Sequence, residues 1–295
     1  MQTLVQTTAF SIARADASDM RACRMLLPHT FTPTNAPETL VALDRSGALI
    51  GAAAVGWEAV GDPAALPVAI HVIPPWRRHG VGRALIDSVT KLADGEAPAL
   101  QPWTVLQEGS DAAAFCLAVG FTVDHRVLHF ESEVEIGLPI IASYHEKLRH
   151  AGRIPTDSCV VPLHAAPAGD VARLISAAFH ASPTVMLARL RGETDTPFEP
   201  KRSVVLLLGG RVVGAHMVTI ASDGIPTIEA HVVSQRLRGG WANALLLHEA
   251  ARIAFEQGSG RYRFVCDERT TAVVGMARRI APEPARKDLA LIRPV

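Results

Sequence analysis

The sequence has little that would tie it to a metal, an oxidising compartment or a nucleic acid. Its four cysteines, Cys23, Cys116, Cys159 and Cys266, lie far apart and form no C-x-x-C pair. Such spacing predicts reduced thiols and no metal site. The formal net charge is zero, whereas a general nucleic-acid binder shows a strong basic excess. We therefore expect no metal and no nucleic-acid partner.

Long apolar runs are missing as well. No stretch approaches the roughly 18 uninterrupted apolar residues of a membrane span, and the first ten residues show no basic segment followed by an apolar one. We expect no membrane partner and a cytoplasmic location. Hydrophobic residues still make up 48% of the 295 residues, so a packed core can form. A chain of this length favours two domains over one.

Periodicity predicts an alternation of strands and helices. Residues 1–137 read as strand, helix, hairpin, strand, helix, strand, helix and strand, with "PVAIHVIP" as the central strand and "GVGRALIDSVTKLAD" as the helix after it. A helix and linker follow at 138–156, and residues 157–295 begin the same order again. The sequence therefore predicts an α/β layered fold in two tandem domains.

The two halves also align residue by residue. An offset of 160 places "IHVIPPWRRHGVGRALI" over "AHVVSQRLRGGWANALL". The aligned pairs are His71 with His231, Arg78 with Arg238, Gly80 with Gly240, and Glu108 with Glu268. A shared element order with one fixed offset indicates a duplicated domain.

The stretch "PPWRRHGVGRAL" offers a site for an anion. A helix N-terminus presents unpaired backbone N–H groups, and glycine lets a phosphate approach them closely. The spacing lacks the Gly-Lys-Ser/Thr of a Walker loop and the third glycine of the dinucleotide fingerprint. A tight strand-to-helix turn with solvated arginines is the alternative reading of the same residues.

In this context the stretch resembles the signature of the GCN5-related N-acetyltransferase superfamily, in which Arg/Gln-x-x-Gly-x-Gly/Ala follows a strand and opens a helix. The matching residues are Ile70, Val72, Pro74, Arg77, Gly80 and Gly82. The hairpin "GALIGAAAVG" before it and "AAAFCLAVGF" after it are similar to that family too. The resemblance implies, for each domain, a mixed, mostly antiparallel twisted sheet flanked by helices.

The resemblance further implies that the first domain binds acetyl-CoA. The pyrophosphate would lie on the amides from Arg78 to Arg83, and the pantetheine arm would pair with the strand. A β-bulge would splay that strand from the next, and an amide near His71 or Val72 would donate to the thioester oxygen. The residues implied are His71, Val72, Ile73, Arg77, Arg78, His79, Gly80, Val81, Gly82 and Arg83.

Four residues are candidates for proton transfer, three as the base and one as the acid. Glu108 ends a strand and is the first candidate for the general base, with a solvated carboxylate as the alternative. His71 is the second, with a hydrogen-bonded core histidine as the alternative, and Glu58 is a weaker third. Many family members use a tyrosine of the late helix as the acid; here Cys116 takes that place, with core packing as the alternative.

The second domain departs further from the family pattern. Under the offset of 160, Leu237 replaces Arg77 and Ala242 replaces Gly82. A second cofactor site would use Val232, Val233, Arg238, Gly239, Gly240, Trp241, Ala242 and Asn243. We interpret this half as a diverged domain that shapes substrate binding or the domain interface; the reverse assignment stays open.

The function that follows is acyl transfer, with acetyl as the expected group, from acyl-CoA to an amine of a small molecule or peptide. Two alternatives stay open: a sensor that binds acyl-CoA without turnover, and an enzyme that acts on the acyl-CoA itself. The segment Leu26–Thr39 would help to form the acceptor cleft. Either a monomer or a homodimer is compatible with the sequence.

Overall fold

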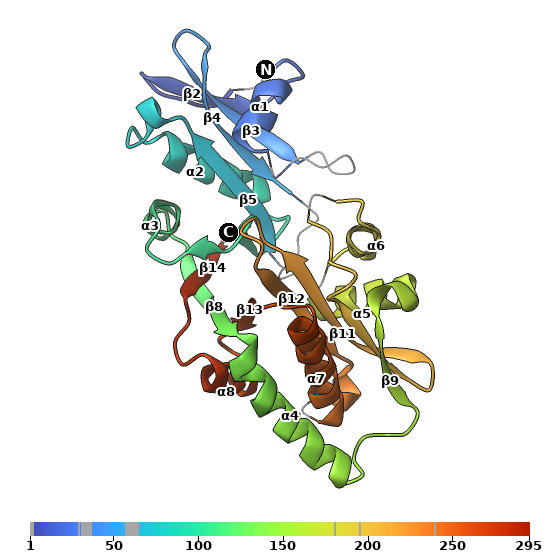
Figure 1. Ribbon diagram of the computed structural model, residues 1–295. Helices are drawn as coiled ribbons and strands as arrows, with labels where there is room; N and C mark the ends of the chain where they lie inside the picture. The colour runs from blue at the N-terminus through green and yellow to red at the C-terminus, as the bar shows by residue number, and fades with distance from the viewer. Residues whose placement is uncertain are drawn as a thin grey trace. The chain divides into compact units, whose positions relative to one another are not determined.

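The computed structural model describes residues 3–28, 30, 37–56, 65–179, 181–194, 196–238 and 240–295. The chain forms two compact units (Figure 1): unit 1 comprises residues 1–126 and 288–295, and unit 2 comprises residues 127–287. The expected fold class is confirmed, because each unit is a mixed, mostly antiparallel sheet with helices packed on it. The boundaries differ from the expected ones, because the last residues of the chain belong to the first unit.

Unit 1 follows the predicted order of elements. Its sheet runs β1-β2-β3-β4-β5-β6-β14, with β7 beside β14, and among the pairings of its described residues the one between β5 and β6 is parallel. The bounds are β1 (Thr3–Gln6), β2 (Phe10–Arg14), α1 (Met20–Leu26), β3 (Glu38–Asp44), β4 (Leu49–Val55), β5 (Ala65–Val72), α2 (Val81–Ala93), β6 (Ala99–Pro102), β7 (Leu106–Gln107) and α3 (Asp111–Ala118).

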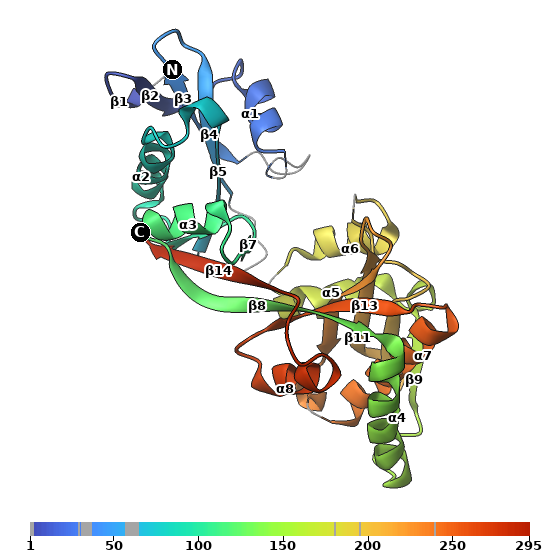
Figure 2. The same ribbon diagram turned by 60° about the vertical axis from the view of Figure 1, so that its left-hand side comes forward.

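Helices cover both faces of this sheet (Figure 2). Helix α2 buries Val81, Leu85 and Val89, which recur at four-residue spacing and so form one apolar stripe. The stripe packs with Ile12, Leu40 and Ile50 of the sheet. On the other face, Cys23 of α1 packs with Val41, Ala52 and Ala54, so the central strands β3 to β5 are covered on both sides.

The last strand of the chain completes unit 1. Strand β14 (Arg286–Pro294) pairs antiparallel with β6 and with β7. Its Leu289 and Leu291 are both buried in the core that α2 and α3 share. Strand β8 (Thr122–Glu133) begins in unit 1 and ends in unit 2. Each unit is therefore built from residues that the sequence-based division assigned to both halves.

Unit 2 repeats the architecture around the strand order β8-β13-β12-β11-β10-β9, in which β12 and β13 form the parallel pair of the described strands. The bounds are α4 (Val134–His150), β9 (Ser158–Pro162), α5 (Ala168–Phe179), α6 (Pro183–Arg191), β10 (Val204–Leu208), β11 (Arg211–Ile220), β12 (Pro226–Val233), α7 (Trp241–Glu256), β13 (Arg261–Asp267) and α8 (Thr271–Ile280). The helix expected within the linker is α4, and it lies inside unit 2.

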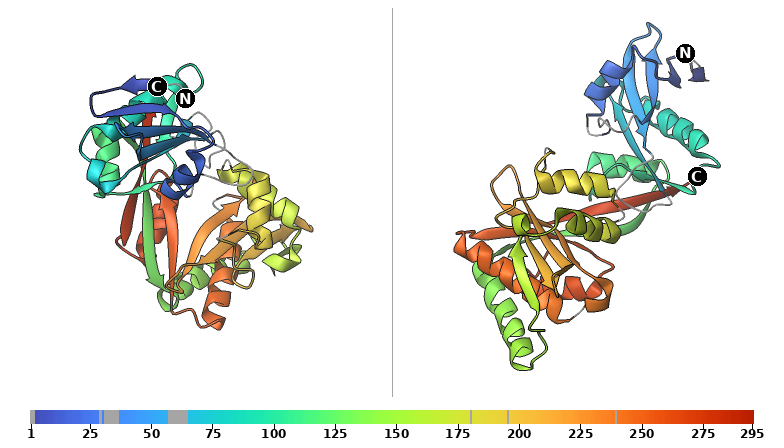
Figure 3. Two further views of the ribbon diagram at one scale, coloured as in Figure 1. Left: turned by 90° about the horizontal axis from the view of Figure 1, so that it is seen from above. Right: turned by 90° about the vertical axis from the view of Figure 1, so that its right-hand side faces the viewer.

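Two layers of helices cover the sheet of unit 2. Helices α5 and α6 pack on one face, where Ile175 and Met186 contact Val205 and Met217. Helix α7 packs on the other face through Leu246, and α4 lies alongside α7 (Figure 3). Among the helices of the described ranges, none is both long and apolar enough to cross a membrane.

Candidate functional site

The loop before α2 has a backbone that glycine makes possible. The chain leaves β5, forms a 3-10 turn at Pro74–Trp76 and enters α2 at Val81. Gly80 caps the helix with a φ of +84°, and a Cβ placed there would have no atom within 4 Å. The space around Gly80 is open and its conformation is left-handed, which L side chains rarely adopt. The first amides of α2 are therefore accessible to an anion.

Gly82 is needed for a different reason. A Cβ at this position would lie 3.0 Å from Cε2 and 3.1 Å from Cζ of Phe115 on α3. Carbon atoms in ordinary contact are about 3.5–4.0 Å apart, so any side chain at Gly82 would push α3 away. The second glycine of the motif thus sets the distance between α2 and α3.

The basic side chains of the loop tie it to its surroundings. Arg77 donates from Nε to the carbonyl oxygen of Val72 at 3.0 Å. The Nδ1 atom of His79 lies 2.8 Å from the carbonyl oxygen of Arg77, and Arg83 donates to the carbonyl oxygen of Ala118 at 3.0 Å. These bonds hold positive charge around the N-terminus of α2, where the helix dipole also favours an anion.

Strand β5 separates from β6 beside this loop. The two strands pair from Ala65 with Ala99 to Val68 with Pro102, and no further. The next backbone contact joins the N–H of Trp103 to the carbonyl oxygen of Val68. The edge of β5 beyond Val68 is therefore unpaired on that side within the described chain, which fits the splayed strand that the family resemblance implies.

The register identifies the amide that points into the opening. The N–H of Ile73 donates to Ile50 of β4 at 3.0 Å. Backbone groups alternate between the two sides along an antiparallel strand, so the N–H of His71 also points to β4 and that of Val72 points away from it. Of the residues expected to line the pantetheine arm, Val72 is therefore the one whose N–H points into the opening.

The expected β-bulge is not found in the described part of β5. The register with β4 is unbroken from Gly51 opposite Val72 to Val55 opposite Val68. The described pairing of β5 with β6 ends at Val68 opposite Pro102, followed by the one bond from the N–H of Trp103 to Val68.

His71 lies on the face of β5 opposite α2. Its neighbours Ile70 and Val72 pack towards α2, whereas Ala69 packs with the cluster of α1. Alternation along the strand places His71 with Ala69. Burial lowers the pKa of His71 below 6.5, and the charge of Arg77 lowers it further. The imidazole is therefore neutral at pH 7 and able to accept a proton.

The other two catalytic candidates have different surroundings. The carboxylate of Glu108 accepts a hydrogen bond from Nε of Arg126 at 3.1 Å, and both side chains are more than a third exposed. Cys116 packs against the core of unit 1, and burial raises the pKa of its thiol to about 11. Glu108 is thus engaged in an ion pair, and Cys116 has the environment of a packing residue.

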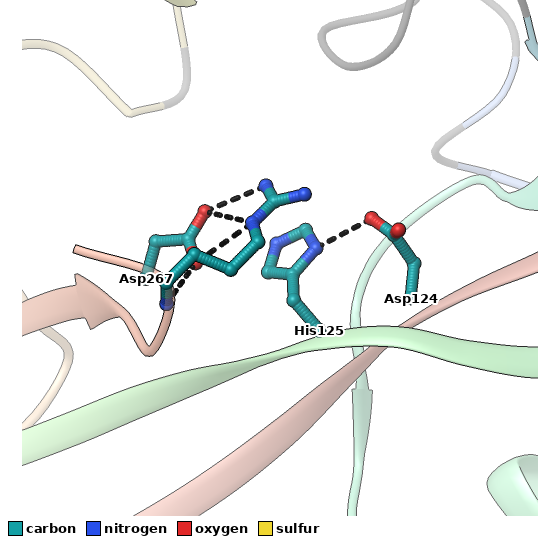
Figure 4. Close-up of polar contacts among 4 residues, drawn as sticks. Asp124, His125 and Asp267 are labelled. Carbon is teal, nitrogen blue, oxygen red and sulfur yellow. Dashed lines mark hydrogen bonds and ion pairs between the residues drawn. The ribbon is translucent and has the colours of Figure 1, made fainter. Parts of the chain in front are cut away.

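A histidine–carboxylate pair that the sequence did not single out lies at the start of β8. The Nδ1 atom of His125 is 2.7 Å from Oδ2 of Asp124, and Figure 4 shows the imidazole directed at this carboxylate. Such a bond orients an imidazole. Figure 4 also shows Asp267, at the end of β13, whose carboxylate accepts hydrogen bonds from the guanidinium and from the backbone N–H of Arg269.

The structure shifts the alignment of the two repeats by one residue. In unit 2, Gln235–Leu237 forms the 3-10 turn that Pro74–Trp76 forms in unit 1. The N–H of Ser234 donates to β11 as that of Ile73 does to β4. The turn and its strand are therefore offset by 161 residues, so Arg238 stands in the place of Arg77, and the expected loss of that arginine is wrong.

With this shift, neither glycine of the motif in unit 1 has a glycine at the equivalent position of unit 2. Leu246 packs on Gly214 as Leu85 packs on Gly51, so the helices share the offset of the strands. Trp241 and Asn243 then take the places of Gly80 and Gly82. Gly240 caps α7 with a φ of −122° rather than a left-handed one. Gly239, also expected at this site, lies outside the described residues.

The other residues of the expected second site are packed inward. Ala242 is buried beneath α7 with Val233, while Val232 faces α5 on the opposite side of the sheet. Trp241 packs against the α7 cluster. Unit 2 thus keeps the 3-10 turn and Arg238, and Gly240, the described glycine at the start of its helix, is not left-handed.

A buried polar network occupies the space beneath α7. His216 and His231 are opposite each other on β11 and β12, with their Nδ1 atoms 3.1 Å apart. Nε2 of His231 lies 3.1 Å from Oδ1 of Asn243. Burial lowers the pKa of both histidines. With both rings neutral, His231 donates to Asn243 and accepts from His216.

Strand β12 carries the bulge that β5 lacks. The register with β11 shifts between Ala230 opposite Met217 and Ile228 opposite Val218, which leaves Glu229 as the additional residue. The Glu229 carboxylate accepts hydrogen bonds from Thr219 at 3.0 Å and from Arg189 of α6. This extra residue explains why the offset is 161 after the bulge.

Part of the expected acceptor region lies outside the description. Glu58 and residues 29 and 31–36 are not among the described residues. Within the segment Leu26–Thr39, Thr30 is buried and its hydroxyl donates to the carbonyl oxygen of Leu27.

Comparison by sequence finds no relative: no protein-family model and no curated protein matches the chain. Comparison by structure does. A GCN5-related N-acetyltransferase from Sphaerobacter thermophilus gives a TM-score of 0.57 at 15% identity, covering 98% of this chain and 97% of that one. A tandem GNAT protein from the clavulanic acid biosynthesis pathway gives 0.59 at 16% identity, covering 97% and 98%.

A third match is Eis1 from Mycobacterium abscessus, with a TM-score of 0.60 at 13% identity, covering 97% of this chain and 73% of that one. At such identities the similarity is one of fold. It extends over nearly the whole chain and includes a protein with two tandem domains.

Proposed function

Because the chain has the tandem fold of the GCN5-related N-acetyltransferase superfamily, we propose that it is an acyl-CoA-dependent N-acyltransferase that holds its acyl-CoA in unit 1. Acetyl is the expected acyl group, and the acceptor is an amine of a small molecule or peptide. The observation that carries the proposal is the accessible N-terminus of α2, where left-handed Gly80 follows a strand with an unpaired edge.

The pyrophosphate fits the N-terminus of α2. Its amides start at Val81, and Arg77, Arg78 and Arg83 add positive charge around them. The pantetheine arm would lie along the edge of β5 that β6 leaves free. There it would meet the N–H of Val72 and compete with Arg77 for the carbonyl oxygen of Val72.

The proposed chemistry is direct transfer. The amine nitrogen attacks the thioester carbonyl carbon, the amine proton passes to a base, and the C–S bond then breaks to release the CoA thiolate. The N–H of Val72 donates to the oxyanion of the intermediate. A preorganised donor of this kind contributes about 10²- to 10³-fold to the rate.

We assign the base to His71 rather than to Glu108. His71 is neutral at pH 7 and neighbours the amide that meets the thioester. The carboxylate of Glu108, by contrast, is engaged in an ion pair with Arg126 at 3.1 Å. A positioned base contributes about 10²- to 10⁴-fold.

In this proposal unit 2 does not bind CoA. Trp241 and Asn243 fill the places of the two loop glycines, and Asn243 contacts His231 rather than leaving room for a phosphate. Unit 2 would instead shape the acceptor site, as the sequence of its loop led us to expect.

Release of free thiol from acetyl-CoA, measured against a panel of primary amines, tests the activity. We expect release that depends on the amine. Binding of acetyl-CoA without release across the whole panel would favour the sensor, an alternative that the ion-paired Glu108 and the half-buried Cys116 support. Loss of malonyl-CoA without any amine would favour an enzyme acting on the acyl-CoA itself.

A further inference from the structure

Helix α4 carries a stripe of apolar side chains that unit 2 leaves uncovered. Ile136, Ile140 and Tyr144 are 49%, 38% and 48% exposed, and their four-residue spacing places them on one side of the helix. The stripe that α4 buries lies one residue further along and consists of Val134, Gly137, Ile141 and Leu148. Helix α7 is the main neighbour of α4 (Figures 1 and 3). Helix α4 therefore has two apolar stripes, of which unit 2 covers one.

Opposite charges flank the exposed stripe at its two ends. Glu133, the last residue of β8, and Glu135, in the first turn of α4, are exposed. Lys147 and Arg149 are exposed at the end of α4, where Arg149 pairs with Glu146 and Lys147 is left as the cation next to the stripe. Along the sequence, Glu133 lies three residues before Ile136 and Lys147 three residues after Tyr144. The order along the stripe is acid, isoleucine, isoleucine, tyrosine and base, and its spacing is symmetrical about Ile140.

We propose that this stripe is a docking surface for α4 of a second copy of the chain, in an antiparallel pair. A two-fold axis at Ile140 places Ile140 against its own counterpart and Ile136 against Tyr144 of the second copy. It places Glu133 opposite Lys147 of the second copy, and this contact occurs twice. An interface of this kind is isologous, so each copy supplies the same surface and the assembly closes as a dimer.

Antiparallel packing is the orientation that the charges favour. In a parallel pair, the acidic ends would lie together, as would the basic ends, and such juxtaposition is unfavourable. In the antiparallel pair, each acidic end meets a basic one, while the apolar centre is removed from water. The apolar centre of the stripe and the charges at its ends thus favour a second copy of α4 in the antiparallel orientation.

The expected dimer is weak and reversible. Helix α4 has 17 residues and is therefore about 25 Å long. One helix pair of this length buries less than the roughly 800 Å² per partner of a standard interface. The dimer fraction should rise with protein concentration, and it should do so without CoA or acceptor, because no residue of the unit 1 site is involved.

Sedimentation velocity over a concentration series tests the interface. We expect the full chain to dimerise with increasing concentration and Ile140→Arg to raise the dissociation constant at least about tenfold, because it places two cations at the axis. Ile220→Arg is the matched control, since Ile220 is an exposed isoleucine (44%) of the same unit on β11. A chain that stays monomeric throughout, or a dimer that Ile140→Arg leaves intact, would overturn the proposal.

Charge reversal tests the direction of the pair. Glu133→Lys and Lys147→Glu should each weaken self-association, because each creates two like-charge contacts. A mixture of the two variants should associate again, as should the double variant, because opposite charges then face each other. Failure of both the mixture and the double variant to recover would contradict the antiparallel arrangement. Far-ultraviolet circular dichroism shows whether the variants stay folded.

Crosslinking tests the position of the axis. Ile140→Cys should form a disulfide-linked dimer under mild oxidation, because the two thiols meet at the axis. Lys147→Cys should not, because residue 147 lies seven positions from the axis and its two copies are about 21 Å apart along an antiparallel pair. The unsubstituted chain, with exposed Cys159, gives the background. Crosslinking of both variants to the same extent would contradict the axis at Ile140.

Discussion

Arg293 of the last strand pairs antiparallel with Leu100 of β6. The sheet of unit 1 therefore includes a strand from the C-terminal end of the chain, which follows the whole of unit 2 in the sequence. The same strand carries Leu289 and Leu291 into the core beneath α2. The candidate CoA site thus depends on the C-terminus of the chain for the packing of its scaffold.

Truncation of Leu291, a core residue of β14, should reduce the stability of unit 1 more than that of unit 2. Leu291 is 3% exposed, so Leu291→Ala should reduce the free energy of unfolding of unit 1 by about 2–5 kcal/mol. Hydrogen exchange followed by mass spectrometry should show faster exchange in β6 and α2. The matched control is Leu206→Ala, which removes a fully buried leucine of unit 2 and should accelerate exchange in β10 and β11. Equal effects of Leu291→Ala on both units would contradict the assignment.

Replacing His71 should reduce the rate in a pH-dependent way. His71→Gln keeps a polar side chain but cannot take the amine proton, so kcat/KM should fall about 10²- to 10⁴-fold at neutral pH. The pKa of His71 lies below 6.5, so the ratio of wild-type to variant rates should be constant above pH 6.5 and decline at lower pH as His71 becomes protonated.

The ratio of wild-type to variant rates isolates the titration of His71, because the titration of the amine substrate affects both proteins equally. Glu108→Gln is the companion variant and should cost less than His71→Gln. A larger loss of kcat/KM in Glu108→Gln than in His71→Gln would indicate that Glu108 is the base.

The buried histidine pair should make unit 2 sensitive to acid. Burial lowers the pKa of His216 and of His231 below 6.5. Below pH 6.5 the unfolded chain therefore binds protons that the folded unit does not, so stability falls as the pH drops. Each histidine contributes at most about 1.4 kcal/mol per pH unit to this slope.

The equivalent positions of unit 1 show which residues can replace the network in a control variant of unit 2. The positions of His216, His231 and Asn243 correspond to Ala53, Ile70 and Gly82 in unit 1, as judged from the strand registers. The triple variant His216→Ala, His231→Ile, Asn243→Gly removes all partners of the network together. Thermal unfolding between pH 7 and pH 5 should show a smaller loss of stability in the triple variant than in the wild type. An unchanged slope would assign the acid sensitivity to other groups.

Local features of the fold could be predicted from the sequence. The glycines, the prolines after "AIHVI" and the apolar spacing of residues 81–93 led to the loop and to α2 as they are found. The mostly antiparallel order within each unit followed from the hairpin turns and from the family resemblance. Each of these features is encoded by neighbouring residues.

Features that depend on distant pairing could not be predicted. Nothing local marks β14 as a strand of unit 1, since its register is set by Leu100 and Leu106. The bulge at Glu229 adds one residue to β12, so identical letters at an offset of 160 aligned residues that occupy different places. His216 was overlooked because its importance lies in facing His231 across two strands. Alternation along the second hairpin was the signal that would have revealed it.

Calorimetric titration of the full chain with CoA tests the central claim most directly. We predict one site per chain, with affinity reduced about tenfold or more, or 1.4 kcal/mol, in Gly80→Asp and largely retained in Gly80→Asn. Both substituents tolerate the left-handed backbone of Gly80 and have nearly the same shape, so they differ in charge at the N-terminus of α2. Two sites per chain, or equal affinity in the two variants, would contradict the assignment of the CoA site to unit 1.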